Sequence, residues 1–398
     1  MTQPVLRIAI NIGSGLLPGL DLVVAGAALA ADRLDLELVG IRDGYDGLLY
    51  PDRYPDGGLV PLRPAMVDNV GHGGSLIGTA ARTDPFRVRV STADHEVEEV
   101  DRSDDILAGL RAAGIGAVIS IVGGSAVTGL HALSVAFKLN RKGVRTACIP
   151  KSIENEIAGV PQAFGYNSVL SHTAETLERI RIGARDVGRL AVVEVPGQHA
   201  GWLALQSGIA AMADAILLPE IPHDLAAVAG ALALRERAGH RCALVVVAEG
   251  ARSAVGAAPS PPAPPGGLRA SLTPNADPDF GEGAHVMDRT GGLAETVATA
   301  LQRLTDREVL PFSLGHLVRG GPPSVLDRQL GLSYGAAAVR ALHAGEDGIM
   351  VSYRPPDLGS VPLRETLGRI RTVPADGALI QTARALGIAL GDEGGAQP

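Results

Sequence analysis

The chain has 398 residues, of which 46% are hydrophobic and 20% charged, and its formal net charge is -8. This length allows two domains or one large α/β unit, and the composition excludes an intrinsically disordered protein. The acidic balance argues against a nucleic-acid partner, because proteins that bind nucleic acids carry basic surfaces.

The order of the residues excludes two more classes. No run approaches the unbroken apolar length of a membrane span, and the N-terminus lacks the basic-then-apolar pattern of a secretory signal. We therefore expect a cytoplasmic protein with no membrane partner. Cys148 and Cys242 both lie in apolar, strand-like runs, which predicts buried free thiols rather than a disulfide or a zinc site.

The first half of the chain alternates strands with helices. Its apolar runs are nearly continuous, as expected for parallel strands buried on both faces. This alternation predicts a parallel, doubly wound sheet. The predicted strands are 6–12, 37–41, 117–122 and 146–149, and the predicted helices are 20–31, 105–113 and 127–141.

Loops rich in glycine or acids follow these strands. They include Gly13 to Gly19, Arg42 to Gly47, Gly73 to Gly78 and Gly123 to Ala126. A glycine-rich loop at a helix N-terminus can cradle a phosphate, although many such loops use glycine simply to turn. Ligands of open α/β sheets bind outside the carboxyl ends of strands, so we expect these loops to share one crevice.

The stretch from Pro150 to Ile157 carries the most chemistry. Glu154 and Glu156 lie two residues apart, with Lys151 and Ser152 just upstream. One carboxylate can act as a base while the other binds a metal or a sugar hydroxyl; the alternative is a solvated acidic turn. Only three of the 35 basic residues are lysines, and the ammonium group of Lys151 suits phosphate binding.

The second half predicts another sheet of the same kind. A Pro-, Ala-, Gly- and Ser-rich segment at 253–283 is typical of a flexible surface loop. The stretch from Leu314 to Arg328 precedes a long helix at 329–342, and 348–391 adds a strand and helices. The other predicted strands are 190–195, 215–218 and 243–248, and the other predicted helices are 168–183, 202–212, 224–237 and 293–305.

Taken together, these motifs resemble those of the phosphofructokinase family over nearly the whole chain. They are Gly15 to Gly19, Asp43-Gly44-Tyr45, Gly123-Gly124, Pro150 to Glu156, Phe164-Gly165-Tyr166, Val193 to Leu205, Ala248-Glu249-Gly250 and Leu314 to Arg328. The resemblance implies a phosphofructokinase-like α/β fold of two doubly wound, Rossmann-like domains with a shared cleft. It places residues 1–165 and about 318–370 in a larger donor-binding domain, and 166–317 and about 371–398 in a smaller acceptor-binding domain.

The resemblance also implies phosphoryl transfer from ATP or pyrophosphate, with Mg²⁺, to a hydroxyl of a phosphorylated small molecule. The family's base falls on Glu154, next to Lys151, Ser152 and Glu156. It further implies a homo-oligomer, a dimer or tetramer, in which Arg189 reaches a neighbouring subunit's cleft. The implied donor-binding residues are Gly15, Tyr45, Arg82, Gly123, Gly124 and Ser125; the acceptor-binding residues are Arg189, Gly197, Gln198, Glu249, His316 and Arg319; and the metal-binding residues are Ser125 and Glu156.

Several positions depart from the family pattern. Ser125 replaces the acid that positions magnesium, and both acids of the central motif are glutamates instead of aspartates. Gln198 and Leu310 fall where the family has arginines, and Leu310 cannot replace a bidentate donor. A misplacement of about 1 Å can cost on the order of a hundredfold in rate.

Three interpretations remain open on the sequence. The first is a working phosphotransferase whose acceptor is not necessarily fructose 6-phosphate. The second is a catalytically degenerate homologue that binds phosphorylated ligands as a regulatory or partner subunit. The third is the same fold running other chemistry on a phosphorylated metabolite. The retained charge of Glu154, Glu156, Arg189, Glu249 and Arg319 favours the first.

Overall fold

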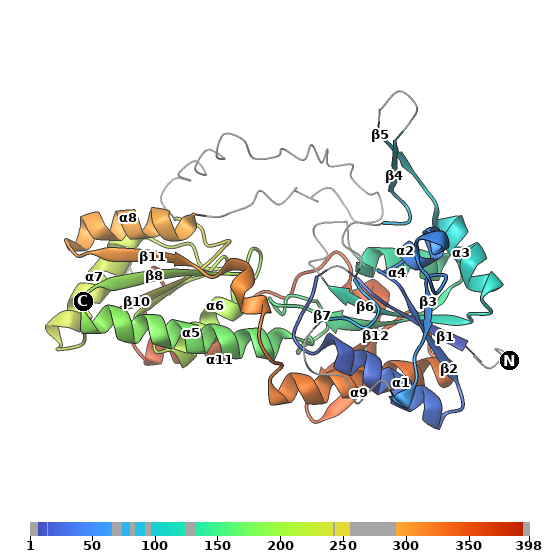
Figure 1. The fold of residues 1–398 in the computed structure, drawn as a ribbon. Coiled ribbons are helices and arrows are strands. Elements are labelled where there is room, and N and C mark those ends of the chain that lie inside the picture. Colours follow the sequence, from blue (N-terminus) through green and yellow to red (C-terminus); the bar gives the residue numbers. More distant parts are fainter. Residues whose placement is uncertain are drawn as a thin grey trace.

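Two α/β domains lie side by side in the computed structural model of the chain (Figure 1). The structure describes residues 7–13, 15–65, 74–79, 84–91, 97–123, 132–241, 243–254 and 292–392. The predicted flexible loop at 253–283 therefore lies outside the described residues, except for its first two positions.

The large domain is built on a sheet with the strand order β13-β12-β7-β6-β1-β2-β3. Its central strands are parallel, but β2 pairs with β3, and β12 with β13, in antiparallel register. The strands are β1 (Arg7–Ile12), β2 (Glu37–Ile41), β3 (Leu59–Pro61), β6 (Ala117–Gly123), β7 (Arg145–Lys151), β12 (Ile349–Arg354) and β13 (Asp357–Pro362). The helices are α1 (Leu20–Arg33), α2 (Asp46–Leu49), α3 (Ser103–Ala112), α4 (Ala132–Arg141), α9 (Val325–His343) and α10 (Leu363–Thr366), with a 3₁₀ turn at Pro51–Arg53.

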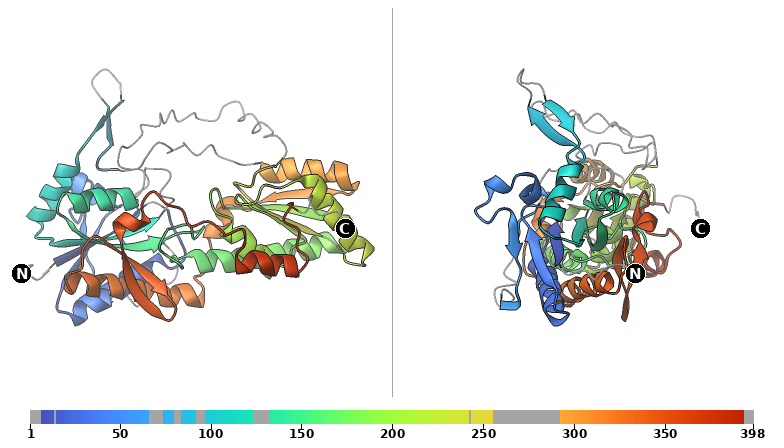
Figure 2. Two further views of the ribbon diagram at one scale, coloured as in Figure 1. Left: turned by 180° about the vertical axis from the view of Figure 1, so that it is seen from behind. Right: turned by 90° about the vertical axis from the view of Figure 1, so that its right-hand side faces the viewer.

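Helices cover both faces of this sheet. Ile8, Ile10 and Ile12 of β1 point into the core shared with α1 and α9, whereas Ala9 packs on the opposite face with Ile106 of α3. This alternation is the period of two expected for a strand. A hairpin of β4 (Val88–Ser91) and β5 (Val97–Val100) stands away from the domain (Figures 1 and 2).

Helices α1 and α9 pack against each other through glycines. A Cβ added at Gly26 would overlap the carbonyl oxygen of Leu332, and one added at Gly335 would overlap the carbonyl oxygen of Val23. Only glycine allows two backbones to approach this closely.

The small domain is built on a parallel sheet with the order β11-β8-β10-β9. Leu190 and Val192 of β8 face α7 and α8, while Ala191 and Val193 face the side covered by α5 and α6. The strands are β8 (Leu190–Val195), β9 (Ala215–Leu217), β10 (Leu244–Ala248) and β11 (Val309–Ser313). The helices are α5 (Tyr166–Asp186), α6 (Trp202–Ala210), α7 (Leu225–Arg237), α8 (Leu293–Thr305) and α11 (Ala378–Ala385), with a 3₁₀ helix at Gly315–Arg319.

The domains are joined at the start of α5, which runs from the large domain along the small one (Figure 1). Asp327 of α9 is buried and accepts hydrogen bonds from the backbone N–H groups of Gly165 (3.0 Å) and Ser168 (2.6 Å), and from the Ser168 hydroxyl. A carboxylate at this position satisfies amides that have no partner within the helix. The first turn of α5 is therefore fixed to the large domain.

The predicted α/β fold is confirmed, with corrections at the edges of both sheets. The sequence did not predict the antiparallel strands β3 and β13, the β4–β5 hairpin or the parallel edge strand β11 of the small sheet. Cys148 is buried in β7 as a free thiol, whereas Cys242 lies outside the described residues. Within the described ranges, no helix is long and apolar enough to cross a membrane.

Candidate active site

The acidic stretch forms a tightly bonded loop after β7. The Ser152 hydroxyl oxygen accepts the backbone N–H groups of Glu154 (2.9 Å) and Asn155 (3.0 Å), and the hydroxyl donates to the Glu156 carboxylate. Asn155 adopts a left-handed backbone conformation with φ of 57°. Its side chain donates to the Pro161 carbonyl (3.0 Å) and accepts the Ala163 N–H (2.9 Å). We call residues 152–157 the acid loop.

Lys151 points from the end of β7 into the first glycine loop. It is 2% exposed, and its Nζ donates to the carbonyl oxygens of Gly13 (3.0 Å) and Gly15 (2.5 Å). Burial, together with the nearby positive charge of Arg319, lowers the pKa of Lys151 to about 7. An amine that changes its charge near neutral pH is therefore held at the loop where the sequence predicts phosphate binding.

Arg319 lies between the first glycine loop, which the sequence predicts to bind the donor, and the carboxylates. A Cβ added at Gly15 would lie 3.4 Å from Nη1 of Arg319. The pKa of Arg319 is lowered, because burial outweighs the opposing effect of the negative charges of Glu154, Glu156 and Glu249. The Arg319 Nε is buried and has no hydrogen-bond partner in the part of the chain that the structure describes. A buried guanidinium with an unused donor is suited to an anionic ligand.

The carboxylates of the site are held largely out of water. Burial raises the pKa of Glu154, and the negative charges of Glu156 and Glu249 raise it further. Burial is also the main cause of the raised pKa of Glu156 and of Glu249, the latter to about 7. A raised pKa brings a carboxylate closer to the working pH of a general base.

Two turns of the small domain, which the sequence predicts to bind the acceptor, pack together, and we call them the acceptor side. Gly250 N–H donates to the Gly197 carbonyl (3.0 Å), and a Cβ at Gly250 would overlap the carbonyl oxygen of Gln198. The Gln198 N–H in turn donates to Oε2 of Glu154 (3.2 Å). The acid loop of the large domain thus directly contacts the acceptor side.

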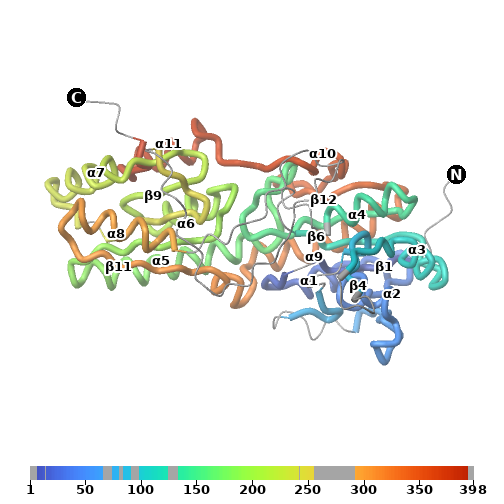
Figure 3. Tube along the Cα trace, turned by 90° about the horizontal axis from the view of Figure 1, so that it is seen from above, coloured from blue at the N-terminus to red at the C-terminus, as the bar shows by residue number. Residues whose placement is uncertain are grey.

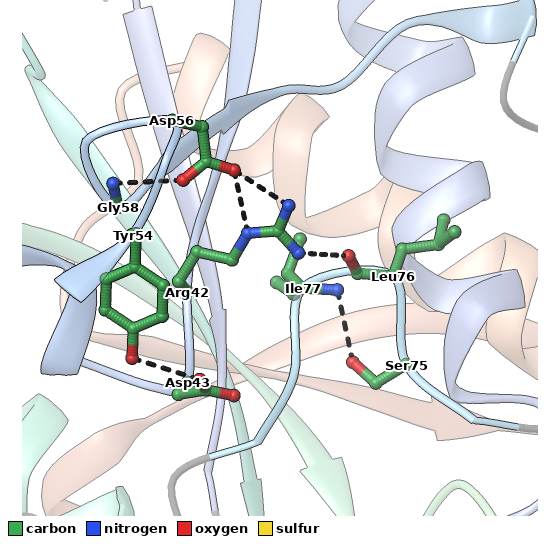
Figure 4. A network of polar contacts seen from close by, with 8 residues as sticks. All are labelled: Arg42, Asp43, Tyr54, Asp56, Gly58, Ser75, Leu76 and Ile77. Carbon is green, nitrogen blue, oxygen red and sulfur yellow. Dashed lines mark hydrogen bonds and ion pairs between the residues drawn. The ribbon is translucent and has the colours of Figure 1, made fainter.

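A second network fixes the loop that follows β3 (Figure 4). Arg42 donates to Oδ2 of Asp56 through Nε (3.0 Å) and Nη2 (2.8 Å), and to the Leu76 carbonyl through Nη1 (3.1 Å). The Tyr54 hydroxyl donates to Asp43 (3.0 Å), and the Leu76 N–H donates to Asp21 of α1 (2.9 Å). The network holds residues 75–78 against the end of β2.

The predicted site residues divide into three groups. The first group consists of residues that the structure brings together: Gly15, Lys151, Ser152, Glu154, Glu156, Gly197, Gln198, Glu249 and Arg319. Gly123, at the end of β6, is close to this group, because a Cβ added there would lie 2.7 Å from the Lys151 carbonyl oxygen. His316 shares the 3₁₀ helix of Arg319 and is exposed. Arg82, Gly124 and Ser125 lie outside the described residues.

Two predicted residues are placed away from this cluster. Tyr45 is 6% exposed in the core, with its hydroxyl 3.4 Å from Ser120 Oγ, and burial raises its pKa to about 12. Its ring packs in the core with Ala9 of β1 and Val118 of β6. Arg189 lies at the amino end of β8, about 20 Å along the strand from Val195 at the other end, and pairs with Glu308 (2.7 Å). It cannot reach the cleft of its own chain.

A divalent cation fits the charge of this site. Within the described ranges, no group of three His, Cys, Asp or Glu side chains forms a metal-binding cluster by itself. Mg²⁺ is commonly held by one or two carboxylates together with substrate phosphates and water. Glu154 and Glu156 are buried near each other with raised pKa values, so a cation would relieve their repulsion.

Comparisons with known proteins identify the family of this chain. The family model described as "Phosphofructokinase" matches residues 7–342. The chain belongs to the phosphofructokinase family. An ATP-dependent 6-phosphofructokinase of Chloroflexus aurantiacus is 35% identical over 387 residues, which cover 97% of this chain and 98% of the relative. An ATP-dependent 6-phosphofructokinase of Streptomyces coelicolor is 33% identical over 378 residues, or 93% of this chain and 97% of the relative.

Solved phosphofructokinases share the fold. The enzyme from Saccharomyces cerevisiae aligns with a TM-score of 0.67 and 25% identity, covering 90% of this chain and 45% of that one. A pyrophosphate-dependent phosphofructokinase from Marinobacter aquaeolei aligns with a TM-score of 0.69 and 16% identity, covering 97% of this chain and 88% of that one.

Sequence reasoning missed the residues that hold the acid loop of this family member in place. Asn155 supports the loop from inside the large domain. Arg371 contacts the loop from the C-terminal segment, and its guanidinium stacks on Trp202. The left-handed position of Asn155 has a sequence signal, since asparagine tolerates this conformation better than most residues.

Proposed function

We propose that this protein transfers a phosphoryl group from ATP or pyrophosphate to a hydroxyl of a sugar phosphate or a related phosphorylated metabolite, with Glu154 as the general base. The observation that carries the proposal is the meeting of the acid loop, Lys151, Arg319 and Glu249 at the carboxyl ends of strands from both domains. Such a cleft joins cationic groups for phosphates with a carboxylate for the acceptor hydroxyl.

Each residue has a defined task in this reaction. Lys151 and the backbone around Gly15 bind the donor phosphates, and Arg319 stabilises the negative charge on the transferring group. Glu154 removes the proton from the acceptor hydroxyl as its oxygen attacks the phosphorus. The bond between this phosphorus and the donor's bridging oxygen breaks, so that ADP leaves when ATP is the donor and phosphate leaves when pyrophosphate is the donor. Glu249 accepts hydrogen bonds from the acceptor's other hydroxyls. Glu156 would hold Mg²⁺, which would neutralise negative charge on the donor phosphates when bound.

The test is a screen of ATP and pyrophosphate against a set of sugar phosphates, with Mg²⁺ and with EDTA. The raised pKa of Glu154 allows it to exchange a proton near neutral pH, so Glu154→Gln should lower kcat by about 10²–10⁴-fold. Glu178→Gln changes an exposed carboxylate of α5 and serves as the matched control.

The outcomes separate the interpretations. Unchanged turnover in Glu154→Gln refutes its role as base. Tight binding of phosphorylated ligands without turnover favours a partner or regulatory subunit instead. Product formed without phosphoryl transfer would assign other chemistry to the fold.

We also infer a homo-oligomer, a dimer or tetramer, in which Arg189 binds the acceptor phosphate in a neighbour's cleft. Its position at the end of β8 remote from its own cleft supports this. Sedimentation measures the oligomeric state. Arg189→Ala should weaken binding of the phosphorylated acceptor without dissociating the oligomer. Unchanged binding in the oligomer would refute the role.

A further inference from the structure

The C-terminal segment between α10 and α11 passes from the large domain to the small domain. Figures 2 and 3 show this crossing as the red part of the chain. On its way it runs beside the acid loop, where Ile370 forms an antiparallel bridge with Ile157. The segment therefore touches both halves of the proposed active site.

Arg371 holds the acid loop by its backbone and by its side chain. Its N–H donates to the Glu156 carbonyl (2.7 Å), and its Nη1 donates to the Asn155 carbonyl (3.1 Å). These two carbonyls belong to the residues directly after the proposed base. Movement of Arg371 would therefore move the backbone that carries Glu154 and Glu156.

The small domain holds the same arginine from the other side. The Trp202 Nε1–H donates to the Arg371 carbonyl (2.7 Å), and the guanidinium of Arg371 lies 3.9 Å from the centre of the Trp202 ring. Glu220 accepts the N–H of Val373 (2.8 Å) and the N–H of Gly201 (3.0 Å), just before Trp202. The crossing segment is thus fixed to the start of α6.

We propose that Arg371, stacked on Trp202, is a positioning residue that holds the acid loop against the small domain and so sets the place of Glu154 and Glu156 relative to the acceptor side. The kinetic consequence rests on the proposed function, whereas the contact itself does not. A planar guanidinium can stack on the indole and donate to a carbonyl at once, which a lysine ammonium does less well.

Kinetics test the role in catalysis. Arg371→Met keeps an unbranched stem like that of arginine but removes the guanidinium, and with it the donor and the charge. A displacement of the loop by about 1 Å lowers kcat on the order of a hundredfold, while KM for the donor stays within about threefold because the donor loops are untouched. Arg371→Lys should recover part of the loss. Arg369→Met, an exposed arginine two residues upstream in the same segment, should leave kcat unchanged.

Trp202→Phe separates stacking from hydrogen bonding. Phenylalanine retains a ring beneath Arg371 but lacks the N–H that donates to its carbonyl, so its kcat should fall less than that of Arg371→Met. The double variant should lose less than the product of the two single losses, because both residues act through one contact. Independent, multiplicative losses, or an unchanged kcat in Arg371→Met, would overturn the proposal.

Tryptophan fluorescence tests the contact without any assay of activity. Trp202 is the single tryptophan of the chain and is only 7% exposed. In Arg371→Met its emission should shift to longer wavelength and acrylamide should quench it more, with no change in Arg369→Met. If no donor and acceptor pair gives turnover, the proposed function fails while this readout still decides the contact. Identical emission and quenching in Arg371→Met and the unaltered protein would refute it.

Discussion

Replacing Lys151 by Met gives a direct test of how the donor loop recognises phosphate. The Lys151 Nζ donates to the carbonyl oxygens of Gly13 and Gly15, and its pKa is lowered to about 7 by burial and by Arg319. A group with this pKa changes charge within the range in which the protein can be assayed. Donor affinity should therefore depend on pH in the unaltered protein through Lys151.

The size of the effect follows from that pKa. With a pKa of about 7, about nine tenths of Lys151 is protonated at about pH 6 and about one tenth at about pH 8. We compare the two proteins by the ratio of their donor affinities, the unaltered protein over Lys151→Met. If only the charged form of Lys151 binds the donor well, this ratio should fall about tenfold between about pH 6 and about pH 8. At the acidic end, the loss of one preorganised cation should weaken binding by about 2–4 kcal/mol.

Calorimetric titration with magnesium pyrophosphate or a non-hydrolysable ATP analogue at several pH values measures this ratio. The ligand's own ionisation is common to both proteins and cancels from the ratio. Glu154 and Glu249 also titrate in the cleft with raised pKa values, but both proteins carry them. A ratio that stays constant from pH 6 to pH 8 would refute the assignment of the charge to Lys151.

The lowered pKa of Lys151 also predicts whether the free energy of unfolding rises or falls with pH. Lys151 has a pKa of about 7 in the folded protein, below its ordinary value of 10.5. Between these values the unfolded chain binds more protons, so stability relative to Lys151→Met should rise with pH from about 7 to about 10.5. Urea denaturation of both proteins at pH 7 and pH 9 measures the difference, and a slope of opposite sign would contradict the reasoning.

Two further predictions concern the framework of the site. Gly335→Ala places a Cβ against the Val23 carbonyl of α1, so it should destabilise the protein by about 1–3 kcal/mol through overpacking. The melting temperature measures this loss, and an unchanged value would show that α1 and α9 can move apart without cost. Asp327→Asn retains one acceptor but not the charge at the start of α5, and it should cost about 1–3 kcal/mol in urea denaturation; Asp376→Asn, at an exposed position, should be neutral.

The parallel centre of the fold could be predicted because each local pattern agrees with the final arrangement. The strands at 37–41 and 190–195 occur at the predicted bounds, since they are short, largely apolar runs followed by a turn, Arg42-Asp43-Gly44 in one case and Pro196-Gly197 in the other. The edge strands could not be predicted. Leu59–Pro61 and Asp357–Pro362 are short or polar, and only pairing with a neighbouring strand makes them strands.

The candidate site was partly predictable for a related reason. Motif residues such as Lys151 and Glu154 lie at strand ends, where an α/β fold brings loops together. Tyr45 lies in such a motif but turns into the core beside Ser120, and no periodicity in a short turn fixes that direction. Arg371 contacts Asn155 across 216 positions of sequence, and an arginine in a polar linker gives no local sign of such a contact.

The contacts of Glu154 explain why this position carries a glutamate instead of an aspartate. On the sequence, its extra methylene is a departure that threatens the placement of the base. In the structure, the longer side chain spans the two domains, because its Oε2 accepts the Gln198 N–H at 3.2 Å. An aspartate would end about 1.5 Å short and could not make this contact without movement of the loop. Gln198 takes part through its backbone, so the loss of an arginine side chain there does not remove the contact. The length of Glu154 is therefore matched to the separation of the domains at the acid loop, and Arg371 and Trp202 form a second link between this loop and the small domain.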